Sequence, residues 1–230
     1  MICYALVTWK QKSCIWDRIT SAYRMTTVIL SLLALAIFAL SADATAKRDK
    51  DLTFQKAVTV DELDIESYEG NWYQMYADKF VYQTFEKNLY CGTATYKDQG
   101  AGNLTVHNYQ TLGSPTGAAD TIDGYAYQED PNEPGKLEVY FPNPDQRSRP
   151  KPAPYYILQL GPKNSDGKYE WSIVSDKISF ALFVLARDVD TFWDKYDVEV
   201  QGILKDLGFS GYTAPVATYQ GEDCVYEIQN

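Results

Sequence analysis

The sequence predicts an all-β domain of eight antiparallel strands followed by one α-helix. Two observations carry this prediction. Eight runs of alternating or apolar residues recur between residues 70 and 187, and most are joined by short turns rich in Gly, Pro and Asn. Residues 190–208 then carry apolar side chains at helical spacing. Eight strands spaced in this way are typical of an up-and-down barrel or of a sandwich.

The first 46 residues are predicted to be a leader. Residues 25–46 follow the order of a secretory signal peptide, because a basic residue precedes the apolar segment 28–40 and small residues follow it. A membrane anchor is the alternative, but 13 mostly apolar residues fall short of the roughly 20 that span a bilayer. We expect cleavage after Ala44 or Ala46, secretion into an oxidising compartment, and no direct membrane insertion afterwards. Residues 1–24 are either a mis-assigned start or long leader, or a targeting extension.

Charge limits the partners of the remaining chain. Residues 1–46 carry four basic and two acidic residues, so the net charge of −10 becomes −12 for the rest. Such a chain is repelled by nucleic acid and by anionic membrane surfaces. Residues 47–66 are polar and acidic, and they predict a loose N-terminal arm with one helical turn near residues 62–66. Residues 67–230 form the predicted barrel domain.

The first predicted strand, residues 70–77, begins with a glycine and a tryptophan. Gly70 weakens a strand but lets another segment approach closely, whereas Trp72 must bury a large indole. Arg187 ends the last predicted strand, where its cation could lie flat on the indole face. The alternative is an ordinary edge strand whose tryptophan is one core aromatic among many.

Alternation of apolar and polar residues predicts the strands that follow. Asn103 begins an Asn-Leu-Thr tripeptide at the first hairpin turn, which is a glycosylation acceptor on an exported protein. Residues 142–154 are rich in Pro and Arg and cannot form a strand, so they are a rim loop or a flexible lid. The predicted strands cover residues 90–97, 103–110, 121–128, 136–141, 155–160, 169–175 and 179–187.

A single helix is predicted over residues 190–208. Asp190 and Thr191 are the expected N-terminal caps, and Gly208 is the expected stop. The apolar stripe of this helix needs a surface to cover, and the outside of a barrel offers one. The tail then carries Cys224, which with Cys91 makes an even pair in the exported part. This pair is read as a disulfide, and two free buried thiols are the alternative.

Over residues 62–226 the chain resembles a lipocalin, most closely the group that includes apolipoprotein D and the bacterial and plant-type lipocalins. The resemblance rests on the Gly-x-Trp start, on Arg187 at the end of the last strand and on several local matches. It implies a closed barrel, the pairing of Cys91 with Cys224, and a barrel floor closed by Trp72 and Arg187. The local matches are Ile122-Asp123-Gly124, residues 136–141, Ala153-Pro154-Tyr155 and residues 182–187.

The resemblance also implies a secreted carrier for a small hydrophobic ligand, such as a fatty acid, lysolipid, sterol, isoprenoid or pigment. An eight-stranded barrel has room for side chains or for one small ligand. For each residue predicted to contact the ligand, the alternative is that it fills a solid core. We take the apolar face of each predicted strand together with the positions that face inward in lipocalins. The residues then expected to contact the ligand are Tyr76, Phe85, Tyr96, Asn108, Ile122, Val139, Phe141, Ile157 and Phe183.

Two other functions stay open. One is a lipocalin-fold enzyme that acts on a lipid or carotenoid, but His107 is the only histidine and is predicted to point outward, so we name no catalytic residue. The other is a protein-binding β module without a cavity. No cofactor is expected, and a zinc site has too few soft ligands. The sequence does not identify a receptor.

Overall fold

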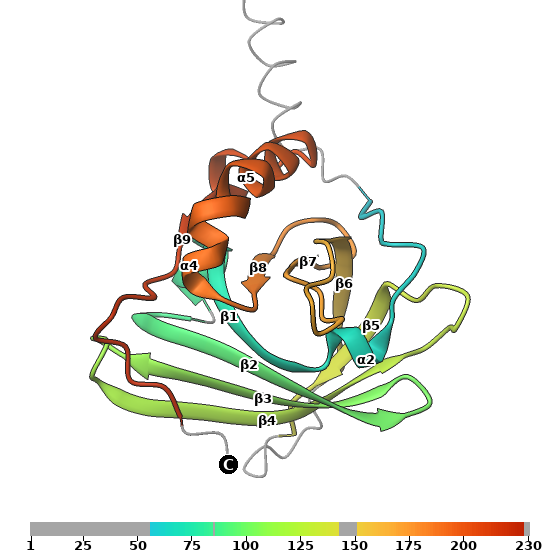
Figure 1. Ribbon diagram of the computed structural model, residues 1–230, viewed down its shortest axis with the longest axis horizontal. Coiled ribbons are helices and arrows are strands. Elements are labelled where there is room, and N and C mark those ends of the chain that lie inside the picture. Colours follow the sequence, from blue (N-terminus) through green and yellow to red (C-terminus); the bar gives the residue numbers. More distant parts are fainter. Residues whose placement is uncertain (1–55, 85, 143–150, 228–230) are drawn as a thin grey trace, which may run out of the picture. The chain divides into compact units, whose positions relative to one another are not determined.

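Eight antiparallel strands close into a barrel in the computed structural model, which describes residues 56–84, 86–142 and 151–227 (Figure 1). Consecutive strands pair side by side, and β1 also pairs with β2, which closes the sheet on itself. The sandwich alternative is therefore wrong. The strands are β1 (Gly70–Asp78), β2 (Leu89–Gly100), β3 (Asn103–Leu112), β4 (Ala118–Gln128), β5 (Lys136–Tyr140), β6 (Ala153–Leu160), β7 (Trp171–Ser175) and β8 (Leu182–Ala186).

Strand β1 closes the barrel by changing partners along its length. Its first residues, from Gly70 to Tyr73, pair with β2, and its last, from Tyr76 to Asp78, pair with the short strand β9 (Pro215–Ala217). Its other edge pairs with β8, and the register shifts between Gln74 and Tyr76. Such a bulge places an extra residue in one strand and changes which side chains face inward. The sequence does not mark this bulge.

All eight predicted strands occur, with bounds that differ at the ends. Strand β2 continues farther into the hairpin than predicted, whereas β3 begins at Asn103 as predicted. The turn between them therefore narrows to Ala101 and Gly102, both with positive φ. Three elements were not predicted. These are helix α3 (Lys79–Thr84) between β1 and β2, the 3-10 helix η2 (Gly211–Thr213), and strand β9 in the tail.

The predicted N-terminal arm is held against the barrel over its described part. The backbone N–H of Ala57 donates to Lys177, and that of Val60 donates to Ile157. Ala57 is buried, so the expectation of a loose arm is wrong for these residues. The predicted helical turn is α2 (Ile65–Tyr68), which begins at Asp64, whose side chain accepts a hydrogen bond from Ser67 N–H.

The C-terminal helix lies outside the barrel in three consecutive pieces (Figure 1). These are α4 (Val189–Thr191), the π-helical turn η1 (Phe192–Tyr196) and α5 (Asp197–Asp206). The N-cap is Asp188, whose side chain accepts a hydrogen bond from Thr191 N–H, and not the predicted Asp190 or Thr191. The helix buries its apolar side chains in one cluster with the outer face of the wall, among them Phe192, Val200 and Leu204.

Several predictions fall on residues outside the described ranges. These are the leader with its signal peptide, residues 47–55 of the predicted N-terminal arm, Phe85 and much of the predicted rim loop. Among the helices that the structure describes, none combines the length and the apolar character required to cross a membrane.

Candidate functional site

The barrel wall has two faces, and each carries its own apolar cluster. The outer cluster joins Met75, Trp171 and Val184 to the C-terminal helix. The inner cluster fills the end of the barrel where β1 begins, and we call this the closed end. Side chains alternate between the two faces along each strand, so the pairing register assigns a face to each residue. The fully packed inner residues include Tyr68, Trp72, Tyr96, Leu104, Val106, Ala126, Leu137, Ile157 and Val174.

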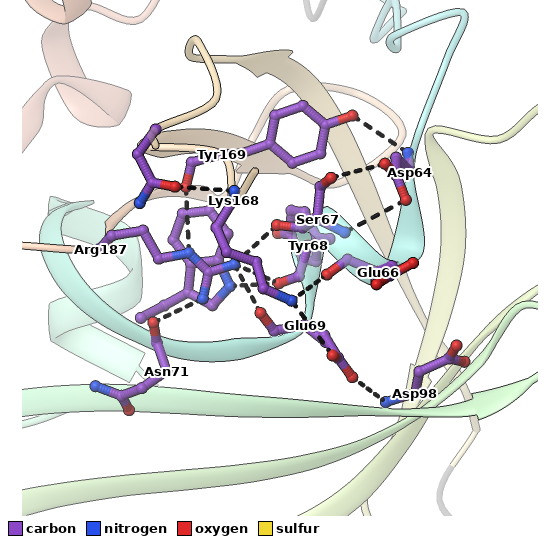
Figure 2. Close-up of polar contacts among 12 residues, drawn as sticks. Asp64, Glu66, Ser67, Tyr68, Glu69, Asn71, Asp98, Lys168, Tyr169 and Arg187 are labelled. Carbon is purple, nitrogen blue, oxygen red and sulfur yellow. Dashed lines mark hydrogen bonds and ion pairs between the residues drawn. The ribbon is translucent and has the colours of Figure 1, made fainter. Parts of the chain in front are cut away.

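Trp72 and Arg187 close this end of the barrel, as the resemblance implied. Figure 2 shows the Arg187 guanidinium beside the backbone at Glu69 and Asn71. The indole of Trp72 is fully buried, and the guanidinium carbon of Arg187 lies 3.7 Å from the centroid of its ring. The guanidinium also donates to the carbonyl oxygens of Asn71 at 2.9 Å and Glu69 at 2.8 Å. Desolvation lowers the pKa of Arg187 to about 10, which leaves it protonated at neutral pH.

Gly70 lets the arginine approach the backbone. A Cβ at this position would lie 3.0 Å from Nη1 of Arg187, and the φ angle of Gly70 is +101°. A side chain here would meet the guanidinium in a backbone conformation that L residues rarely adopt. The prediction that Gly70 permits a close approach is confirmed, and the approaching group is Arg187.

A cluster of phenol hydroxyls lies above this floor, inside the barrel. The hydroxyl of Tyr155 lies 2.7 Å from that of Tyr68 and 2.9 Å from that of Tyr96. Tyr68 also contacts Ser172 Oγ at 3.3 Å. Burial raises the pKa of all three tyrosines, so they stay neutral across the physiological range. The hydroxyls satisfy one another in an otherwise apolar interior.

The inner wall is less tightly packed toward the other end, which we call the open half. Asn108 pairs with Ile122 across β3 and β4, two residues beyond Val106 and Gly124 on the same face. Ile122 is 46% exposed although it faces inward, whereas Val106 is 2% exposed. Solvent therefore reaches the inner face of β4 at this level.

Aromatic and aliphatic side chains line the rest of the open half. Val139 and Phe183 face inward and are partly buried, and both pack against the inner cluster. Phe141 lies on Gly124, where a Cβ would come within 2.5 Å of its ring. The absence of a side chain at Gly124 therefore lets the Phe141 ring pack closely against β4.

In the open half, strands β3 and β4 carry polar groups on the inner wall. The amide oxygen Oδ1 of Asn108 is buried and has no hydrogen-bond partner among the described residues. One inward position farther toward the open end, Gln110 Nε2 donates to Asp120 Oδ2 at 2.8 Å. The wall therefore offers one unpaired acceptor and one carboxylate at neighbouring levels.

The C-terminal tail is fixed to the outside of the barrel by a disulfide. Cys91 and Cys224 are bonded across a sequence separation of 133, so the alternative of two free thiols is wrong. Farther along, the tail carbonyl of Val225 accepts a hydrogen bond from the Tyr109 hydroxyl at 2.8 Å. Figure 1 shows the tail crossing the strands β2 to β4.

A family model described as a lipocalin-like domain matches residues 63–213, which is more than half of the chain. The chain belongs to the lipocalin family. This lipocalin is 35% identical to apolipoprotein D of Rattus norvegicus over 98 residues, which cover 43% of this chain and 46% of that protein. It spans about half the length of the curated relatives that it matches.

Two solved structures illustrate the likeness of fold. H1 crustacyanin from the lobster Homarus americanus is 19% identical, covers 74% of this lipocalin and 91% of its own chain, and gives a TM-score of 0.49. Japanin from Rhipicephalus appendiculatus, solved bound to cholesterol, is 14% identical. The match covers 71% of this lipocalin and 100% of the japanin chain, with a TM-score of 0.49.

Most of the residues predicted to contact a ligand lie on the inner wall of the lipocalin. Tyr96 and Ile157 belong to the packed closed end, where they are 3% and 0% exposed. The others border the less packed open half, and their contact with a ligand stays a prediction. These are Asn108, Ile122, Val139, Phe141 and Phe183.

The inward orientation predicted for Tyr76 is wrong. The bulge in β1 places Tyr76 opposite Val184, on the outer face. Its hydroxyl donates to Asp197 Oδ1 at 2.6 Å, and its ring contacts Trp193 edge-on. Tyr76 therefore fixes the helix to the wall. Phe85, another predicted contact, lies outside the described residues.

Sequence reasoning missed several inward polar groups of this lipocalin. Tyr68 comes from α2, which precedes the first strand, so strand alternation gave no indication that it faces inward. Tyr155 lies on β6, whose two faces are both apolar in the sequence. The inward orientation of Gln110 and Asp120 follows from the alternation of faces along β3 and β4, because each lies two residues from an inward-facing Asn108 or Ile122. That extension was available from the sequence.

The single histidine and the glycosylation acceptor both lie outside the barrel interior. His107 faces outward, as predicted, between Asp123 and Glu227. Its Nδ1 lies 2.6 Å from Asp123 Oδ1, and its Nε2 lies 2.6 Å from Glu227 Oε2. Asn103 is exposed at the β2–β3 turn, and glycosylation there stays a prediction. Within the described ranges, no group of three or more His, Cys, Asp or Glu side chains is arranged to hold a metal ion.

Proposed function

We propose that this lipocalin is a secreted carrier that holds one small hydrophobic ligand in the open half of its barrel. The contrast between the two levels of the inner wall supports this proposal. Side chains at the level of Val106 are buried, whereas Ile122, on the same face, is 46% exposed. A barrel packed throughout would bury both.

The chemistry of the open half favours an apolar guest. Val139, Phe141, Phe183 and Ile122 present aliphatic and aromatic surface, which is typical of pockets for lipid-like molecules. Removing such surface from water contributes about 25 cal/mol per Å², before the cost of association is subtracted. Fatty acids, lysolipids, sterols, isoprenoids and pigments all satisfy this requirement.

Two features support export. The disulfide between Cys91 and Cys224 is of a kind that persists in oxidising compartments. Residues 25–46 follow the order of a secretory signal peptide, with a basic residue, an apolar segment and then small residues. We propose that the chain enters the secretory pathway and is cleaved after Ala44 or Ala46.

We propose binding without catalysis. Both ring nitrogens of His107 contact carboxylates on the outer face, away from the inner wall. The inner hydroxyls of Tyr68, Tyr96 and Tyr155 bond to one another, and their raised pKa values keep them protonated at neutral pH, so that no phenolate serves as a base. A lipid-transforming enzyme of this fold would need an activated group on the inner wall.

The proposal is tested by recovering the ligand. The full chain is expressed in a secreting eukaryotic host, purified from the medium, and analysed by native mass spectrometry before and after lipid extraction. We expect an additional mass that extraction removes. A chain that stays empty after exposure to lipids of every class named above would instead support a cavity-free protein-binding module.

A matched pair of variants locates the bound molecule. Ile122→Arg places a cation on the inner wall, whereas Thr121→Arg places the same cation on the outer face of the neighbouring residue. Both positions are exposed, so neither change disturbs a packed core. We expect the first variant to lose the bound mass and the second to retain it. Equal retention would place the ligand elsewhere.

A further inference from the structure

One buried acceptor on the inner wall has no donor. Asn108 Oδ1 is shielded from solvent and has no hydrogen-bond partner among the described residues. Its side chain faces inward between Ala94 on β2 and Ile122 on β4, at the boundary between the packed and the open levels. Buried polar atoms in folded proteins almost always have partners, so an orphan at the edge of a binding space indicates a place for a polar group of the guest.

The inner wall of the open half carries negative charge. Asp120 is the next inward-facing residue on β4 after Ile122, about 7 Å farther toward the open end. Its carboxylate accepts a hydrogen bond from Gln110. Among the inward positions of the described strands, neither lysine nor arginine occurs. Arg187 lies beneath the Trp72 indole at the closed end, where it donates to backbone carbonyls. A carboxylate placed in the open half would therefore meet the like charge of Asp120, and no cation on the inward positions of the described strands would pair with it.

We propose that the polar end of the ligand donates a hydrogen bond to Asn108 and carries no negative charge, so that it is a hydroxyl or an ammonium. The inference rests on the proposed carrier function and narrows its ligand class. Fatty acid anions and anionic lysolipids are disfavoured, because burying an unpaired anion is costly. Sterols, long-chain alcohols and amphiphilic amines meet the requirement. Asp120 would add an attraction for the ammonium.

The test compares three ligands that share one saturated chain and differ at its end. The chain carries a hydroxyl, an ammonium or a carboxylate, and each compound displaces the uncharged fluorophore Nile red from the purified full chain at neutral pH. We expect the alcohol and the amine to compete at concentrations about tenfold lower than the carboxylate, the size of effect that one hydrogen bond provides.

Three variants assign the preference to named residues. Asn108→Leu removes the acceptor at similar volume and should weaken the alcohol and the amine about tenfold, while leaving the carboxylate unchanged. Asn108→Asp keeps an acceptor and adds charge, so it should favour the amine further. Asp120→Asn should weaken the amine but not the alcohol. Asp166→Asn makes the same charge change in the turn after β6, at the closed end, and should alter none of them.

The outcomes separate the two proposals. A carboxylate that competes as well as the alcohol, or an alcohol unaffected by Asn108→Leu, would overturn the inference about the polar end while leaving the carrier function in place. Failure of Nile red and of all three compounds to bind would contradict the carrier function, and the inference with it. Circular dichroism of each variant verifies that the fold is intact.

Discussion

The guanidinium carbon of Arg187 lies 3.7 Å from the centroid of the Trp72 ring, although 115 positions separate the two residues in the sequence. The contact joins the end of β8 to the start of β1, where the barrel closes. Because the guanidinium also donates to backbone carbonyls of α2 and β1, one side chain holds three elements together (Figure 2).

Replacing Arg187 should destabilise the barrel without changing its inner wall. Arg187→Lys keeps the charge but loses the planar group that stacks on Trp72 and reaches several carbonyls. We expect a loss of about 1–3 kcal/mol in the free energy of unfolding, measured by urea denaturation. Lys205→Ala, in the last turn of α5, serves as the control and should change little. Equal stability of Arg187→Lys and the unmodified chain would refute the role given to this contact.

Gly70→Ala should be costly for two separable reasons. The new Cβ would lie 3.0 Å from Arg187 Nη1, and the φ angle of +101° strains any L side chain. We expect a loss of about 1–3 kcal/mol in the free energy of unfolding. Gly167→Ala has a φ of +76° but nothing within 4 Å of its Cβ, so it measures backbone strain alone. A loss no greater than that of Gly167→Ala would show that close contact with Arg187 is unimportant.

Much of the fold was predictable because local patterns determine it. Alternation located the eight strands, and apolar spacing located the helix after β8. The face of Tyr76 was not predictable, since a single bulged residue in β1 leaves no trace in composition. Helix α3 was missed because six residues are too few to show a helical period.

Contacts within the candidate site were predictable only between residues on adjacent strands. Asn108 and Ile122 followed from parity, and the structure pairs them directly. The hydroxyl cluster joins Tyr68, Tyr96 and Tyr155, which are brought together by barrel closure and not by strand pairing. No local pattern predicts such a contact, because it depends on how the whole sheet curves.

The disulfide should contribute strongly to stability. It closes a loop with a sequence separation of 133, for which the chain-entropy model gives about 4–5 kcal/mol as an upper value. Reduction should therefore lower the midpoint of urea denaturation of the unmodified chain. The variant that carries both Cys91→Ala and Cys224→Ala should start at the lower midpoint and not respond to reductant. A midpoint that reduction leaves unchanged would contradict this expectation.

The tail should be held more firmly in acid than in alkali. Partial desolvation would lower the pKa of His107, but hydrogen bonds to Asp123 and Glu227 outweigh it and raise the pKa above its ordinary value near 6.5. A raised pKa in the folded state means that the contact contributes fully below about pH 6.5. The contribution is then lost as the pH rises through the folded pKa.

Imidazole NMR titration measures this shift directly. We expect Glu227→Gln to lower the pKa of His107, whereas Asp223→Asn, whose carboxylate contacts Tyr219 instead, should leave it unchanged. Hydrogen exchange of the tail amides should accelerate above the measured pKa. A histidine that titrates at or below its ordinary value would show that the two carboxylates do not hold it in the charged form.

Nile red titration of two tryptophan variants on β5 tests the carrier function most directly. Val139 faces the open half of the barrel, and Glu138 lies next to it on the outer face. Filling the interior with Val139→Trp should weaken Nile red binding about tenfold or more, the effect of roughly 1–3 kcal/mol of overpacking. Glu138→Trp should bind as the unmodified chain does. Equal affinity of both variants would show that the barrel interior is not where the ligand binds.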